Sequence, residues 1–126
     1  MRLLLLSLAL TVLAGNASAQ LGPARFKCAG SEPFWSLEIS ASGMAKFAAP
    51  ESELTAAGTS FTGKMAVVQN RNPPAWIWRG AAKPGAPDLV AAITPMACGE
   101  PSGENAPYTL WLSLPNGRAL TGCCRQ

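Results

Sequence analysis

Histidine is absent from this chain of 126 residues, and its absence narrows the chemistry that the protein can perform. Histidine is the commonest general base in enzymes and the commonest metal ligand. Without it, a hydrolase would depend on a Ser–Lys pair or on two carboxylates that face a cleft. The closely spaced acids, Glu51 with Glu53 and Glu100 with Glu104, fall in segments that we expect to be exposed. We therefore predict a protein that is not an enzyme and that uses no cofactor and no metal.

Charged residues are few, at 13% of the chain. Ten Lys and Arg stand against seven Asp and Glu, and the basic residues are scattered along the sequence. A nucleic-acid-binding surface needs clustered basic residues, often with aromatic residues between them. The composition therefore argues against a nucleic acid as partner.

Long apolar runs are also lacking. The longest, residues 3–13, is shorter than the roughly 20 residues that a membrane-spanning helix needs. It follows Arg2 and precedes Ala17-Ser18-Ala19, which is the pattern of a cleaved signal peptide. A lipid anchor would need a cysteine where Asn16 stands.

The domain organisation follows from this leader. We predict that residues 1–19 are a signal peptide, cleaved between Ala19 and Gln20, and that residues 20–126 form a single domain. The short basic start is typical of bacteria, so we expect a soluble monomer in the periplasm or the medium.

The remaining sequence consists of short segments separated by Gly, Pro and Asn. Alternation of apolar and polar residues predicts strands at 25–29, 34–40, 44–48, 61–69, 75–80, 88–94, 108–114 and 118–123. About eight short strands at this spacing indicate an all-β fold, a small antiparallel barrel or sandwich. Residues 50–58 carry helix start and stop signals, and we read them as a short helix, with a ninth strand as the alternative.

Two kinds of connection are expected between these segments. Pro115-Asn116-Gly117 predicts a tight hairpin turn with positive φ at both Asn116 and Gly117. Residues 83–87 and 99–107 are rich in Pro and Gly and predict exposed loops.

Four cysteines, Cys28, Cys98, Cys123 and Cys124, predict two disulfides in an exported domain. Adjacent cysteines pair only in a strained ring. Successive strand residues point to opposite faces, so Cys123 and Cys124 should reach different partners. We favour Cys98–Cys123 with Cys28–Cys124, which would close the first strand onto the last, and the exchanged pairing stays open. A redox pair or metal site is disfavoured, since there is no C-x-x-C spacing and no histidine.

The most distinctive string is Gly30-Ser31-Glu32-Pro33-Phe34-Trp35. Pro33 should make Glu32 extended, and Phe34 and Trp35 should face opposite sides of a strand. One interpretation is a strand entry in which Glu32 bonds backbone N–H groups or an arginine. The other is that Glu32 and Trp35 face a ligand at a barrel mouth. Similarly, Trp76 and Trp78 share a face and could either stack on a ligand or fill the core.

The chain resembles an uncharacterised bacterial family of small exported or lipoprotein-type proteins, often labelled predicted membrane proteins or lipoproteins. The resemblance rests on the G-x-E-P-F-W string with Ile39, on Cys98 with Pro107-Tyr108, and on the closing Gly122-Cys123. It implies a small β domain and supports pairing Cys98 with Cys123. It implies no activity, and the aspartate-rich loop of that family is replaced here by residues 99–104.

Two functions remain in view. The first is a non-enzymatic envelope module that binds a protein, a cell-wall fragment or a small apolar ligand through its tryptophans. The second is an inhibitor of an envelope enzyme such as lysozyme, in which Glu100 and Glu104 on a protruding loop meet a basic cleft.

Overall fold

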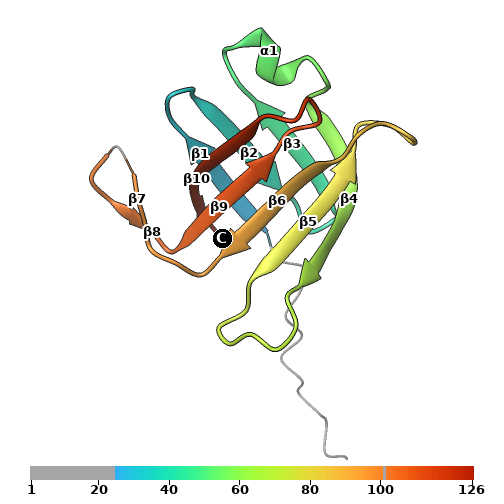
Figure 1. Ribbon diagram of the computed structural model, residues 1–126. Coiled ribbons are helices and arrows are strands. Elements are labelled where there is room, and N and C mark those ends of the chain that lie inside the picture. Colours follow the sequence, from blue (N-terminus) through green and yellow to red (C-terminus); the bar gives the residue numbers. More distant parts are fainter. Residues whose placement is uncertain (1–24, 101) are drawn as a thin grey trace, which may run out of the picture.

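A closed antiparallel barrel of eight strands makes up most of the protein (Figure 1). The computed structural model describes residues 25–100 and 102–126, so the predicted signal peptide and its cleavage site lie outside the described residues. Around the barrel the strands run in the order β1-β10-β9-β6-β5-β4-β3-β2, and β1 and β2 close the ring. No helix among the described residues has the length and apolarity that a membrane span requires.

The elements have the following bounds. The barrel strands are β1 (Phe26–Gly30), β2 (Trp35–Ile39), β3 (Met44–Ala48), β4 (Ser60–Val67), β5 (Trp76–Ala81), β6 (Leu89–Thr94), β9 (Tyr108–Ser113) and β10 (Ala119–Arg125). A separate two-stranded ribbon consists of β7 (Cys98–Gly99) and β8 (Asn105–Ala106), and α1 spans Ser52–Thr55.

The prediction of an all-β barrel with a short helix is confirmed, and most strand ends differ from the predicted ones by one or two residues. The alternative of a ninth strand at residues 50–58 is wrong, because α1 lies there and Leu54 turns into the core. Residues 99–107 are not only a loop, since they contain most of the ribbon. At the last hairpin, φ is positive at Gly117 but not at Asn116, whose side-chain oxygen accepts a hydrogen bond from the Arg118 N–H.

The barrel interior is filled by side chains. Alternate residues of each strand turn inward, as the period of a strand requires. The largest of the fully buried side chains are Trp78, Phe26, Phe47, Phe61, Leu37, Ile39, Leu89, Ile93, Leu110, Leu112 and Cys124. Phe26, Trp76 and Tyr108 make mutual edge-to-face contacts. Helix α1 lies at one end of the barrel (Figure 1), and its Leu54 is buried.

Both disulfides have the preferred pairing. Cys28 of β1 lies directly opposite Cys124 of β10, and their bond joins the first and last strands inside the barrel. Cys123 points outward from β10 and bonds to Cys98 of β7, which ties the ribbon to the barrel. The adjacent cysteines therefore serve opposite faces of one strand, as predicted.

Candidate functional site

A groove on the outside of the barrel lies between the β1–β2 turn and the ribbon. Its volume is about 480 Å³. Its floor is made by the end of β1 and the middle of β10, its walls by Phe34 on one side and the ribbon on the other. The described residues that line it are Ala29, Gly30, Ser31, Phe34, Cys98, Gly99, Glu100, Ser102, Thr121, Gly122 and Cys123.

Beneath the floor, one tryptophan of the barrel core packs on two glycines. The Trp35 side chain is 4% exposed and lies against Gly30, its strand partner, and against Gly122 of β10. A Cβ at Gly30 would stand 2.3 Å from the Trp35 Nε1 atom, and one at Gly122 would stand 2.6 Å from Trp35 Cζ2. Only glycine allows this approach. The two ends of the sequence resemblance, Gly30 to Trp35 and Gly122-Cys123, are therefore one structural unit.

The first wall is Phe34, which is 66% exposed although its neighbour Trp35 is buried. The two aromatic side chains face opposite sides, as the strand pattern predicts. The expectation of an extended Glu32 is wrong: its φ is 59°, in the left-handed region, and the peptide bond to Pro33 is cis. The chain reverses between β1 and β2 within residues 31–34, and the positive φ of Glu32 is part of that reversal.

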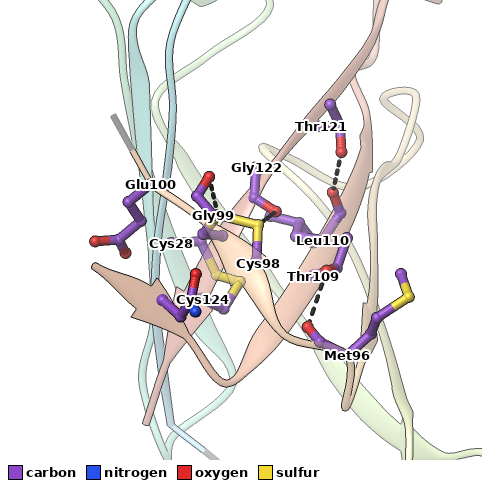
Figure 2. The surroundings of a disulfide bond; sticks show 12 residues. Cys28, Met96, Cys98, Gly99, Glu100, Thr109, Leu110, Thr121, Gly122 and Cys124 are labelled. Carbon is purple, nitrogen blue, oxygen red and sulfur yellow. Dashed lines mark hydrogen bonds between the residues drawn. A yellow bond between two sulfur atoms is a disulfide. The ribbon is translucent and has the colours of Figure 1, made fainter. Parts of the chain in front are cut away.

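The second wall is the ribbon, which is held by the Cys98–Cys123 bond and by Arg125 (Figure 2 shows the disulfide). The Arg125 guanidinium lies 3.1 Å from a carboxylate oxygen of Glu100 and 3.8 Å from one of Glu104, and it donates a hydrogen bond to the Asn105 carbonyl oxygen. Where the ribbon begins, the Thr109 hydroxyl donates to the Met96 carbonyl oxygen (Figure 2). The wall is thus fixed by covalent, ionic and hydrogen bonds.

The structure separates the residues that we singled out as ligand-facing. Trp76 and Trp78 share a face, but that face is the barrel interior, where they are 9% and 0% exposed. The interpretation that these two rings stack on a ligand at the surface is therefore wrong. They fill the core, because closure of the barrel turns their face inward. Trp35 is buried beneath the groove, while Glu32 is exposed on the turn that carries Phe34.

Sequence reasoning considered Phe34 and Trp111 among the aromatic residues but did not single them out as the exposed ones. Trp111 is 53% exposed and lies between Leu110 and Leu112, which both point inward. That alternation was the available signal, since a residue between two core leucines of one strand must face out. For Phe34, the signal was that it and Trp35 face opposite sides of a strand, so that one of the two rings must lie outside the core.

The groove offers binding groups rather than reactive ones. Its described side chains supply the hydroxyls of Ser31, Ser102 and Thr121, one carboxylate and the Phe34 ring. The carboxylate of Glu100 is ion-paired with Arg125, and the Thr121 hydroxyl donates to the Leu110 carbonyl oxygen. Such an arrangement can hold an apolar group while hydroxyls bond its polar neighbours.

No known protein family, no curated protein and no solved structure matches this chain. The function proposed below is therefore inferred from the geometry of the described residues.

Proposed function

We propose that this is an exported, non-enzymatic binding domain that takes an apolar side chain of an envelope protein into the groove beside Phe34. The observation that carries the proposal is the exposure of Phe34, at 66%, on the rim of a concave site. Aromatic side chains next to a pocket are typical anchors of protein interfaces. Packing within the barrel does not require this phenyl ring, because Trp35 fills the core position of the same string.

The interior of the barrel is filled by side chains, which supports a binding site on its outer surface. Small barrels either pack side chains inside or enclose a ligand. Here Trp78 is fully buried at mid-barrel, and Phe26 and Phe47 are buried with it. We therefore assign binding to the outer surface.

A protein partner fits the groove better than a small free ligand does. The groove is partly open to solvent, and Phe34 is the one aromatic residue among the described residues that line it. Small molecules bind tightly where most of their surface is enclosed. A protein side chain needs less enclosure, because the surrounding surfaces of the two proteins shield it from water.

The same geometry weakens the inhibitor hypothesis. Glu100 and Glu104 would have to leave Arg125 before they could meet a basic cleft, since both carboxylates lie within 4 Å of its guanidinium. The groove needs no such rearrangement, so we favour it over the acidic loop as the binding element.

The test compares wild type with Phe34→Ala. An envelope extract of the source cell is passed over the immobilised domain, and the protein retained is identified, purified and titrated. We expect Phe34→Ala to weaken its binding by at least tenfold, because removal of a central aromatic anchor costs about 2 kcal/mol. Met44→Ala is the matched control, since Met44 is exposed at 38% away from the groove.

Two results would contradict the proposal. One is retention of no protein by the wild-type domain, and the other is equal binding by wild type and Phe34→Ala. The export part is tested separately by mass spectrometry of the protein from its native cell, where we expect a mature chain that begins at Gln20.

A further inference from the structure

The two disulfides differ in how closely a small molecule can approach them. Cys28 and Cys124 are 4% and 0% exposed, and their bond lies inside the barrel. Cys98 is partly exposed, and both Cys98 and Cys123 line the groove. A thiolate must contact a sulfur atom to break a disulfide, so access to the bond controls the rate of the reaction. The groove therefore gives a small thiol access to the Cys98–Cys123 bond and not to the other.

The ribbon depends on this bond for its attachment to β10. Its strands, β7 and β8, have two residues each and pair with each other rather than with a barrel strand. Arg125 of β10 makes two ion pairs and one hydrogen bond with the ribbon, all from a side chain that is partly exposed. Ion pairs at the surface add little stability. The Cys98–Cys123 bond is therefore the main tie between the ribbon and the barrel.

Both cysteines of this pair have a hydrogen-bond acceptor within reach if the bond is reduced. The Sγ atom of Cys98 lies 3.4 Å from the Gly122 carbonyl oxygen (Figure 2), and that of Cys123 lies 3.6 Å from the Gly99 carbonyl oxygen. A thiol formed at either position can donate its proton there, so neither is left buried without a partner. Cys123 also points outward while Cys124 points inward, so the freed thiolate faces away from the inner bond.

We propose that Cys98–Cys123 is a site of thiol–disulfide exchange, at which a small dithiol in the groove reduces this bond while Cys28–Cys124 stays intact. One thiolate of the dithiol attacks the Sγ atom of Cys98, the more exposed cysteine, and Cys123 leaves as a thiolate that takes a proton from water. The second thiol of the dithiol then attacks the mixed disulfide and releases Cys98 as a thiol. The dithiol is oxidised to a disulfide, and the cysteine pair gains the two electrons and two protons that it loses.

Reduction changes the groove, and the effect of this change on binding rests on the function proposed above. The ribbon forms one wall of the groove, and the exchange removes its covalent tie to β10. The wall is then free to move, while the barrel stays closed by Cys28–Cys124. Binding in the groove thereby responds to the thiols around the protein. The lack of a C-x-x-C motif disfavoured a redox pair, but Cys98 and Cys123, 25 positions apart, meet only in the folded chain.

The experiment treats the folded mature protein with dithiothreitol without denaturant and blocks free thiols with N-ethylmaleimide at successive times. Cys28 and Cys98 belong to different bonds, so mass spectrometry of the peptides that contain them follows each bond separately. We expect Cys98 to be labelled at least about 100-fold faster than Cys28, because access to the inner bond requires β1 to separate from β10. Circular dichroism should show that the barrel stays folded. Equal rates, faster labelling of Cys28, or no labelling of either at a concentration that reduces the urea-unfolded protein overturns the proposal.

Hydrogen exchange tests the release of the ribbon. In the selectively reduced protein, the Glu100 and Gly103 amides should exchange about tenfold faster, while the amides of β5 and β6 keep their rates. The double variant Cys98→Ser with Cys123→Ser mimics the reduced state and should show the same pattern without dithiothreitol. Unchanged exchange at these two amides in both samples overturns the release of the wall.

Phe34→Ala separates this inference from the proposed function. It truncates the wall opposite the ribbon, so Cys98 should still be labelled before Cys28 in this variant. Selective labelling of Cys98, together with retention of no envelope protein by the wild-type domain, would contradict the proposed function and support the exchange site. Equal labelling of Cys28 and Cys98 would contradict the exchange site whatever protein the groove binds.

Discussion

The indole ring of Trp35 lies against the backbone of Gly122, and the two residues are 87 positions apart in the sequence. A Cβ at Gly122 would meet not only this ring but also the Ala29 carbonyl oxygen, at 2.3 Å. The contact joins β2 to β10 across β1, at the point where the first and last strands of the barrel meet. Gly122 also lines the floor of the groove, so closure of the barrel and shape of the site depend on the same glycine.

Gly122→Ala should therefore destabilise the barrel by about 2–3 kcal/mol, because the added methyl group overpacks a site that is closed by backbone on one side. Urea denaturation followed by circular dichroism measures the change. Gly99→Ala is the control: its Cβ would approach only Asn105 Oδ1, at 4.0 Å, and we expect less than about 0.5 kcal/mol. Equal stability of the two variants would contradict the packing argument.

The two disulfides should contribute unequally. Cys28–Cys124 closes a sequence separation of 96 residues and Cys98–Cys123 one of 25. Loop-closure entropy assigns about 4.7 kcal/mol to the longer loop and about 3.5 kcal/mol to the shorter. Replacing both cysteines of the buried pair by alanine should lower the free energy of unfolding by at least about 1 kcal/mol more than replacing both of the ribbon pair, as measured by urea titration. The reverse order would show that the Cys98–Cys123 bond contributes more to the free energy of unfolding than the bond that closes β1 onto β10.

Trp111 should account for the solvent-accessible part of the tryptophan fluorescence. Its ring is 53% exposed, whereas Trp35, Trp76 and Trp78 are at most 9% exposed. Stern–Volmer quenching by acrylamide should show an accessible and a protected population, and Trp111→Phe should remove the accessible one. Trp76→Phe is the comparison, and it should leave the accessible population in place. An accessible fraction that survives Trp111→Phe would contradict the barrel closure described above.

Arg125→Ala should loosen the ribbon without unfolding the barrel. Its ion pairs with Glu100 and Glu104 are at the surface, where such pairs contribute up to about 1 kcal/mol. We expect a small change in the free energy of unfolding but faster hydrogen exchange at the Glu100 and Gly103 amides, which bond within the ribbon loop. NMR-detected exchange measures this. Arg79→Ala removes a comparable surface contact with Asp88 and should leave these two amides unchanged.

Several features could be predicted because they depend on neighbouring residues. Alternation placed the barrel strands, since a strand turns every second side chain to one face. The same rule sent Cys123 and Cys124 to different partners, and closure of the first strand onto the last was the reason to prefer the pairing that the structure has. Pro50 and Gly58 bracket the segment that contains α1, for the local reasons that make proline start and glycine end a helix.

The candidate site could be predicted only in part. Glu100 and the G-x-E-P-F-W string were singled out, and both lie at the groove, but the groove itself joins residues 29–34 to residues 98–123. Nothing local in the sequence brings those segments together. The ribbon was missed because its two strands have two residues each, too few for a periodic pattern.

By itself, then, the sequence determined the strand content, the face of each strand residue relative to its neighbours, and the division of labour between the adjacent cysteines. Only the tertiary structure decided which of the two faces is inside. Closure of β1 onto β10 turned Trp76 and Trp78 into the core, and it left Phe34 and Trp111 in water. The physical reason is that side-chain alternation is a local property of the backbone, whereas burial depends on contacts between strands that are far apart in the chain.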